Sequence, residues 1–396
     1  MVEIPRPLAI WQQEESALSS VDDLTEGRLT RRSALVAGAG GLLATSGLAA
    51  LLDAGSADAL AGRRSPILAS AAAQAGTLTI LTFPGWYGPH EFANFDKQHP
   101  GITIKTAVSG TTGAAAQIAQ IETNPGAFDV TLAGVPVSSQ MHAAGVLEPL
   151  KTSQIPNLKL VGSTFRKSLP YGIPTDFGKT GYGYRKDLIT ERPTTWRELW
   201  TTLAKKYSGK ITMLKYDSDI QGTALKYLGY SVNTKSKSQL QAMQNALLKL
   251  KPHLQAILET DYSKALIEGT AVIAIDYDYD IAAAQKHNKN IVWVAPKEGM
   301  AAYLEGWCAL KGSKLLPTVW ELMNSHLAPK NYASFINNTG SAFVEQSATR
   351  YISKSIVHNP SLRYDPVALK RVEFEKYLGP TQIAYRGRLW EQFLAA

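Results

Sequence analysis

The chain has 396 residues, of which 45% are hydrophobic and 19% charged, and its formal net charge is +8. This composition excludes a disordered or fibrous chain and predicts a folded protein of about two domains. The one cysteine, Cys308, excludes an internal disulfide and a cysteine-based zinc site.

Residues 1–76 are expected to form an export signal and leader. Arg31 and Arg32 precede a long uncharged stretch rich in Ala, Gly and Leu, and small residues at 57–61 and 71–75 offer cleavage sites. The paired arginines resemble a twin-arginine signal. A buried glycine-rich helix and a membrane anchor are the alternatives for this stretch.

After the leader the chain keeps its basic excess, which nucleic acid or an anionic membrane surface would explain. We favour dispersed, solvated lysines instead, because the Lys/Arg runs are short and no nucleic-acid motif is present. No nucleic-acid partner is therefore expected.

From residue 77 onward strands alternate with helices, which predicts largely parallel sheets covered by helices. Apolar, β-branched stretches predict strands at 77–83, 102–108, 128–134, 181–187, 209–214, 271–276, 290–296 and 301–307. Helical patterns occupy 88–100, 111–123, 194–200, 219–230, 237–250, 263–268, 317–328 and 329–340. Open α/β sheets bind ligands beyond the carboxyl ends of their strands, so two such lobes facing one another would form a cleft.

Enzyme signatures are missing from the sequence. No GxSxG, HExxH, GxxxxGK[ST] or CxxC motif occurs, and the seven histidines are scattered rather than paired at ligand spacing. We expect no catalytic residue and no cofactor. The alternative is a secreted hydrolase or transferase that uses an acid pair such as Asp278 and Glu305.

Aromatic and acidic residues gather where predicted strands end. Phe83 and Trp86 follow the first strand, while Tyr216 and Asp219 lie between a strand and a helix. For Asp219, capping of the helix and ligand contact are equally favoured. Tyr303 shares one face of its predicted strand with Glu305.

The stretch "DYDYD" at 276–280 follows an apolar run. If the strand continues, Asp276, Asp278 and Asp280 share one face and the two tyrosines share the other. Ligand contact by at least one aspartate is favoured over a solvated strand end that caps the next helix, and both are favoured over a metal site. The run lacks the glycine and the terminal glutamate of a calcium loop. Aromatic faces with carboxylates suit a cationic, partly aliphatic ligand.

From about residue 77 to the C-terminus the chain resembles the bacterial spermidine/putrescine-binding proteins, the solute-binding subunits of polyamine ABC transporters. The stretches that carry the resemblance include "FDVTLAGVPVSSQMHAAGVLEPL", "YGIPTDFGKTGYGYRKD", "ALKYLGYSVNT", "WVAPKEG" and "EGWCALKGS". The resemblance implies a two-lobed type II periplasmic-binding-protein fold, each lobe a mainly parallel sheet flanked by helices. It also implies a first lobe of 77–183 plus 304–352, a second lobe of 184–303 plus 353–396, and a hinge near Tyr184 and Tyr303.

The resemblance and the pattern of acids and rings together give the candidate ligand-binding residues, although Tyr216 and Ser341 stand where the family has an aspartate and a tyrosine. These residues are Phe83, Trp86, Tyr216, Asp219, Asp276, Asp278, Tyr303, Glu305, Ser341 and Glu375. Val135 and Pro136 depart from the pattern, since a serine and a tyrosine stand there in the family. Glu305 is the leading candidate partner for an amine of the solute.

The resemblance therefore implies an exported, monomeric receptor that captures a small cationic solute, a polyamine such as putrescine or spermidine, and delivers it to a membrane permease. A different cationic or zwitterionic solute is the alternative ligand for the same receptor fold.

Overall fold

The computed structural model describes residues 75–83, 86–87, 92–109, 114–363 and 369–396. Residues 73–396 form one compact unit. The predicted export signal and its paired arginines lie outside the described residues.

Eleven strands form one hydrogen-bonded network in the order β2-β1-β3-β9-β4-β7-β5-β6, with β8 and β10 on β4 and β11 on β9. Pairing is parallel within β1–β3, within β5–β7 and between β9 and β11, and antiparallel wherever β4 pairs and between β3 and β9. The strands are β1 (Gly76–Thr82), β2 (Ile102–Val108), β3 (Val130–Gly134), β4 (Ile173–Arg185), β5 (Ile211–Leu214), β6 (Leu254–Leu258), β7 (Ile273–Tyr277), β8 (Ile291–Val294), β9 (Met300–Ala309), β10 (Ala342–Phe343) and β11 (Val372–Phe374).

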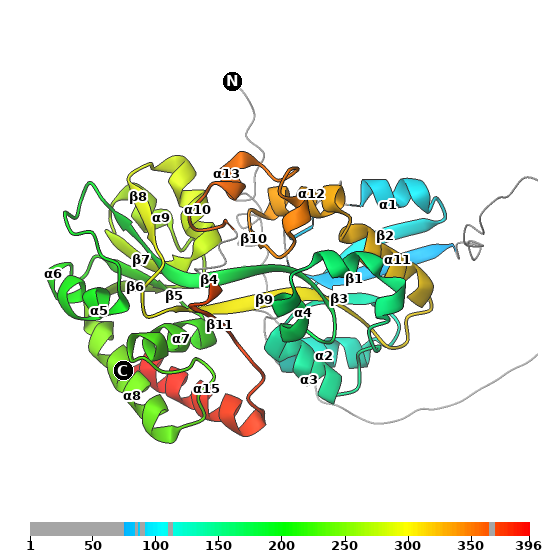
Figure 1. The fold of residues 1–396 in the computed structure, drawn as a ribbon. Coiled ribbons are helices and arrows are strands. Elements are labelled where there is room, and N and C mark those ends of the chain that lie inside the picture. The colour runs from blue at the N-terminus through cyan, green and yellow to red at the C-terminus, as the bar shows by residue number, and fades with distance from the viewer. Residues whose placement is uncertain (1–74, 84–85, 88–91, 110–113, 364–368) are drawn as a thin grey trace, which may run out of the picture. The chain divides into compact units, whose positions relative to one another are not determined.

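Two long strands connect the halves of this network (Figure 1). All thirteen residues of β4 are buried. Residues 173–179 of β4 pair with β9, and residues 180–184 pair with β7. Near Lys179 and Thr180, β4 therefore passes from the β1–β3 half to the β5–β8 half.

Helices cover both halves. They are α1 (Ala93–Gln98), α2 (Ala114–Thr123), α3 (Val135–Ala143), α4 (Ser163–Ser168), α5 (Trp196–Glu198), α6 (Ala204–Lys206), α7 (Asp217–Tyr227), α8 (Lys237–Leu250), α9 (Lys264–Glu268), α10 (Asp278–His287), α11 (Leu316–His326), α12 (Pro329–Thr339), α13 (Lys354–Val357) and α15 (Pro380–Ala395). Between α5 and α6, residues 199–203 form a π-helical turn, and short 3₁₀ turns occupy 152–154, 156–160, 251–253 and 346–348.

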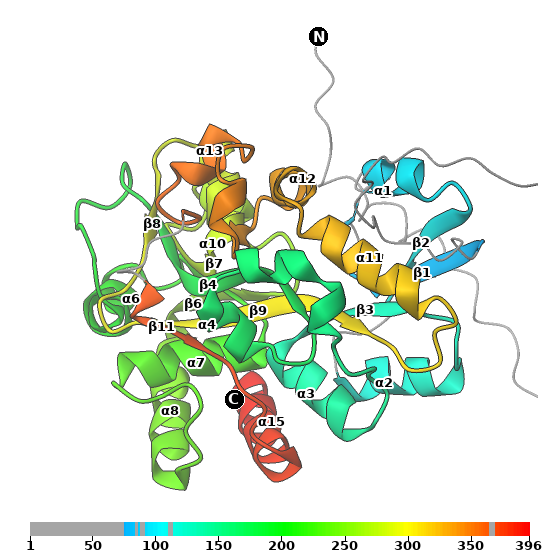
Figure 2. The same ribbon diagram turned by 45° about the vertical axis from the view of Figure 1, so that its right-hand side comes forward.

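The C-terminal helix α15 packs beside α8 (Figures 1 and 2). The Gln244 amide donates to the Leu389 carbonyl at 2.8 Å, and the Lys251 ammonium donates to the Phe393 carbonyl at 2.6 Å. The end of the chain is thereby fastened to the half that contains β5–β8.

Each half has its own apolar core. One core gathers β1, β3, α11 and α12 around Trp307, Trp320 and Phe335. Another gathers α5, α7, α8 and α15 around Trp196, Met243 and Phe393. A smaller cluster lies between β3 and α3, and a further one lies under α10. Two separate cores are what a chain of two α/β halves needs, because each sheet must bury its own faces.

Most predicted elements are present with ends shifted by a few residues, and α8 coincides with its predicted range. Gly269 has a φ of 83°, a conformation that favours glycine, so the helix-to-strand turn predicted there is confirmed. The sheet is mixed rather than largely parallel, because β4 and β9 enter antiparallel to their neighbours.

The strand predicted at 271–276 does not continue through residue 280. β7 ends at Tyr277, and α10 begins at Asp278. The acidic residues of the first turn suit the positive end of the helix dipole, which favours a helix start here.

Candidate functional site

Carboxyl groups from several elements gather near the point where β4 crosses between the halves. Asp176 on β4 pairs in register with Glu305 on β9, so the two side chains leave the same face. Asp219 lies in the first turn of α7, and the acidic run lies at the end of β7. These residues form one acidic cluster near the middle of β4 and β9 and the carboxyl ends of β5 and β7. Its members are Asp176, Asp219, Asp276, Asp278, Asp280 and Glu305.

Asp176 is fully buried. Its Oδ1 accepts a hydrogen bond from the Thr175 hydroxyl at 2.9 Å, while Oδ2 has no hydrogen-bond partner among the described residues. Burial raises the pKa of Asp176 to about 7, an effect that the Thr175 and Ser341 hydroxyls partly offset. An unpartnered buried carboxylate oxygen is costly. A ligand ammonium group or a proton on Asp176 would reduce this cost.

Glu305 is half-buried and faces Asp176. Burial, followed by the negative charges of Asp176 and Asp219, raises the pKa of Glu305 well above its ordinary value. Two neighbouring carboxyls resist ionising together, so a bound cation would favour the ionised form of the Asp176–Glu305 pair.

Asp219 is buried, and its carboxylate does not cap α7. Its Oδ1 accepts from the Thr180 hydroxyl at 2.9 Å, and its Oδ2 accepts from the Tyr277 hydroxyl at 3.0 Å. Burial raises the pKa of Asp219 to about 6. Of the two roles weighed for this residue, the structure removes the cap and places the carboxylate beside the aromatic residues of the cluster.

The acidic run at 276–280 is divided between β7 and α10. Asp276 is fully buried, and its carboxylate accepts from the Ser263 hydroxyl and from the Tyr277 backbone N–H, both at 2.7 Å. Burial raises the pKa of Asp276 to about 7. Asp280 is half-buried, and burial together with the charges of Asp276 and Asp278 raises its pKa well above its ordinary value. A solvated strand end, the alternative from the sequence, is wrong because none of the three aspartates is fully exposed.

Asp278 is the member of the run that has a cationic partner. The Lys179 ammonium lies 2.6 Å from its Oδ2, and both side chains are buried. The same ammonium lies 4.8 Å from the centre of the Phe177 ring. Burial still raises the pKa of Asp278, although Lys179 opposes that shift.

Tyrosine rings surround the carboxyls. The rings of Tyr277 and Tyr279 stack with centres 5.5 Å apart at 11°, and Tyr303 meets Tyr277 edge-on at 5.6 Å. Tyr216 and Tyr262 approach Tyr277 at 6.4 and 6.3 Å. Flat rings beside buried acids can cover methylene groups and attract ammonium groups.

Gly178 lies beneath Tyr303. A Cβ atom at this glycine would come within 2.3 Å of the Tyr303 hydroxyl oxygen. The missing side chain therefore allows Tyr303 to lie over β4, inside the ring of tyrosines.

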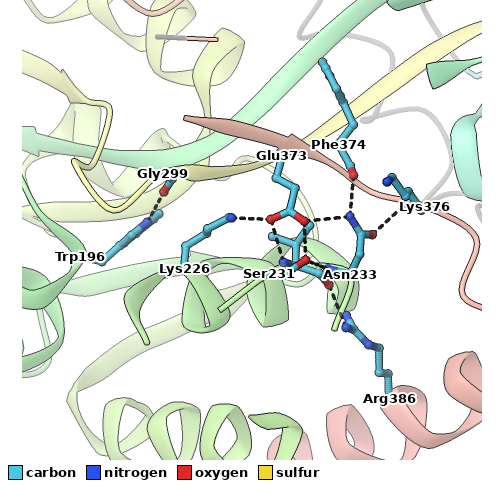
Figure 3. A network of polar contacts seen from close by, with 10 residues as sticks. Trp196, Lys226, Ser231, Asn233, Gly299, Glu373, Phe374, Lys376 and Arg386 are labelled. Carbon is cyan, nitrogen blue, oxygen red and sulfur yellow. Dashed lines mark hydrogen bonds and ion pairs between the residues drawn. The ribbon is translucent and has the colours of Figure 1, made fainter. Parts of the chain in front are cut away.

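A polar network holds the segment that carries Glu375 (Figure 3). Glu373 accepts hydrogen bonds from Lys226 and Asn233, and Asn233 also donates to the Phe374 carbonyl at 2.9 Å. The Glu375 backbone N–H donates to Ala302 on β9 at 3.1 Å. These contacts fix the backbone on both sides of Glu375. Burial and the negative charge of Asp219 raise the pKa of Glu375 well above its ordinary value, which places it at the edge of the cluster.

The structure brings many of the predicted site residues together. Phe83 and Trp86 are half-buried and pack against the core around Trp307, and they follow β1, which runs parallel to β3, whose end pairs with Glu305. Ser341 is fully buried and lowers the pKa of Asp176, so it belongs to the cluster.

Sequence reasoning missed Asp176, Lys179 and Thr180, as well as the roles of Tyr277 and Tyr279. A signal for the first two was present. Opposite charges three residues apart interrupt a stretch that otherwise reads as a buried strand, and buried charges are rare unless they are paired or functional.

Other features give the site no further chemistry. A surface hollow between α1 and α12, lined partly by Lys97, Lys330 and Tyr351, contains none of the predicted site residues. Among the described residues, no group of three or more His, Cys, Asp or Glu side chains has an arrangement that could hold a metal ion. None of the helices in the described part of the chain combines the length and apolar character needed to cross a membrane.

Taken together, two α/β halves joined by crossing strands, with acids and aromatic rings at the crossing, define a ligand-binding protein. A family profile described as bacterial extracellular solute-binding protein matches residues 92–361. The chain belongs to this bacterial extracellular solute-binding protein family, and the predicted fold class is confirmed.

The chain is also similar to individual proteins with related names. It is 23% identical over 328 residues to the spermidine/putrescine-binding periplasmic protein of Escherichia coli K12, covering 80% of this chain and 92% of that protein. It is 23% identical over 339 residues to a putrescine/cadaverine-binding protein of Pseudomonas aeruginosa, covering 82% of this chain and 95% of that protein.

Solved structures show the same fold. A putative spermidine/putrescine ABC transporter protein from Listeria monocytogenes matches with a TM-score of 0.70 at 23% identity, covering 80% of this chain and 98% of that one. The spermidine/putrescine transporter substrate-binding protein of Streptococcus pneumoniae, solved with calcium and HEPES, matches with a TM-score of 0.72 at 20% identity, covering 81% and 98%.

Proposed function

We propose that this chain is an exported receptor that binds a polyamine between its two halves and delivers it to the permease of an ABC transporter. The observation that carries the proposal is the charge balance of the acidic cluster. Six carboxyls gather where β4 crosses between the halves. Among the ion pairs of the described residues, Lys179–Asp278 is the one that involves this cluster. Buried carboxylates need protons or cations. A flexible chain with ammonium groups supplies cations at several points, and the tyrosines can cover the methylenes between them.

The names of the relatives support the same ligand class, since the Escherichia coli protein is a spermidine/putrescine-binding protein and the Pseudomonas aeruginosa protein binds putrescine and cadaverine by name. No covalent chemistry is required of such a receptor. The carboxyls act by accepting charge-assisted hydrogen bonds, with Glu305 and Asp176 facing one amine and Asp219 facing another.

We further propose that the chain forms the two lobes predicted from the sequence, 77–183 plus 304–352 and 184–303 plus 353–396. The passage of β4 between sheets near Thr180 supports a hinge close to Tyr184 and Tyr303. A ligand that touches both lobes would stabilise their closed arrangement. Small-angle scattering of the full chain with and without putrescine tests closure, which predicts a smaller radius of gyration with ligand.

Calorimetry of the purified, dialysed full chain with putrescine, cadaverine and spermidine tests the ligand class. L-lysine and L-glutamine serve as matched negative solutes. Heat of binding from at least one polyamine and from neither amino acid is expected. Absence of binding by all three polyamines at millimolar concentration would remove the proposal.

Export by the twin-arginine route is part of the proposal and has its own test. Replacing Arg31 and Arg32 by lysine would keep the charge of the leader but remove the paired arginines. The variant is expected to remain inside the cell, as followed by fractionation of its own host. Unchanged export would exclude this route and leave the ligand proposal unaffected.

A further inference from the structure

Lys179 is the unusual feature of the cluster, because it brings a positive charge into a place where the proposed ligand would bring its own. Its side chain has 7% exposed surface, and that of Asp278 has none. A buried lysine is costly unless a carboxylate pairs with it. The distance of 2.6 Å between Nζ and Oδ2 supplies that pairing.

The ion pair lies where the β4–β7 ladder ends. Thr180 on β4 is opposite Tyr277, the last residue of β7. Lys179 and Asp278, the first residue of α10, are the next residues on the two segments. The Lys179 ammonium reaches Asp278 there, and it lies 4.8 Å from the centre of the Phe177 ring.

The pair lies within the electric field of the rest of the cluster. The charge of Asp278 contributes to the raised pKa of Asp176 and to that of Tyr303. A positive charge on Lys179 next to Asp278 cancels that contribution. The lysine thus acts electrostatically where an ammonium group of a ligand would act.

We propose that the Lys179 ammonium occupies one cation position of the site and thereby shifts its preference toward solutes with fewer ammonium groups, such as diamines. This inference rests on the polyamine function proposed above and names the subclass of ligand.

The other carboxyls of the cluster differ from Asp278 in having no cationic partner among the ion pairs of the described residues. Asp176 and Glu305 face one another across β4 and β9 and resist double ionisation, and Asp219 accepts hydrogen bonds from the neutral hydroxyls of Thr180 and Tyr277. Asp278 alone among them is paired with Lys179. The site therefore balances one ammonium group fewer than it would with a neutral residue at position 179, and any additional ammonium group would lie in the field of Lys179.

Calorimetry with putrescine and spermidine on the full chain and on variants tests the inference. Lys179→Met frees Asp278, so the ratio of spermidine to putrescine affinity should rise roughly tenfold or more. Lys179→Arg keeps the charge and should keep the ratio. Lys179→Met combined with Asp278→Asn removes both charges and should restore the wild-type ratio to within about threefold.

Asp278→Asn provides a second test in case the Lys179→Met variant folds poorly. It leaves the ammonium unpaired, so affinity for both ligands should fall, with the larger loss for spermidine. An unchanged ratio in Lys179→Met, or unchanged affinities in Asp278→Asn, would overturn the inference while polyamine binding by the wild type stands. A wild type that binds no polyamine would refute the proposed function first, and this inference with it.

Discussion

Replacing Asp176 by asparagine should stabilise the ligand-free protein at neutral and alkaline pH. The carboxyl is fully buried, and its Oδ2 has no hydrogen-bond partner among the described residues. Its ionisation in the folded state is opposed chiefly by burial. Asparagine has nearly the same shape and no charge, so it avoids this cost.

The sign and size follow from linkage between protonation and folding. The pKa of Asp176 is higher in the folded protein than its ordinary value, so its contribution lowers the free energy of unfolding as pH rises through the interval from about 4 to 7. A rise from 3.8 to about 7 corresponds to roughly 4 kcal/mol above pH 7, at about 1.4 kcal/mol for each pKa unit. Proton uptake by Glu305 relieves part of this, so a gain of about 2–4 kcal/mol is expected.

Urea unfolding of wild type and Asp176→Asn at pH 4, 6 and 8 measures the effect, with ligand removed by dialysis. The stability difference should be small at pH 4 and largest at pH 8. Asp187→Asn is the matched control of opposite sign, because Arg185 holds the pKa of this surface carboxyl below its ordinary value. That variant should lose stability at pH 8.

An Asp176→Asn protein that is less stable than wild type at pH 8, or whose advantage does not shrink toward pH 4, would refute the reasoning. Polyamine affinity gives a second readout. The same variant should bind putrescine more weakly, because the carboxylate that would accept a hydrogen bond from the ligand ammonium group is absent.

Three further changes test other parts of the site. Glu305→Gln should weaken putrescine binding roughly tenfold or more by calorimetry, because a charge-assisted hydrogen bond is lost, whereas Glu321→Gln on the exposed face of α11 should not; equal affinities would remove Glu305 from the site. Gly178→Ala should lower the free energy of unfolding, measured by urea denaturation, by about 1–3 kcal/mol and alter the near-UV circular dichroism, because its Cβ would clash with the Tyr303 ring. Unchanged spectra and stability would show that the ring does not lie there. Glu373→Ala should speed hydrogen exchange at residues 372–376, because the network in Figure 3 is broken; unchanged exchange would show that this network does not hold the segment.

The alternation of strands and helices was readable from the sequence because it depends on local patterns of apolar residues. β6, β10 and β11 were not predicted. β10 and β11 have only two and three residues, too few to show a period, and their pairing is decided by β4 and β9. Helix α15 was also missed, although Pro380 at its start and the buried Leu389 and Phe393 gave a signal.

The candidate site was less predictable because it depends on register. The acidic run was recognised, but whether Asp278 lies on a strand or a helix depends on where β7 ends. Asp176 and Lys179 were overlooked because each acquires its partner from a distant strand, Glu305 on β9 and Asp278 after β7. Sequence spacing carries no information about such pairs.

The way β9 joins the two halves has a consequence for how this protein is made. Val130 on β3 pairs with Ala309 on β9, and Ile173 on β4 pairs with Trp307 on β9. The first sheet therefore cannot close while the ribosome is still translating its middle segments, since the strand that completes it is synthesised much later. Contacts between such distant segments slow folding. The nascent chain must stay free of aggregation until most of it has emerged, which gives chaperones a long interval in which to bind it.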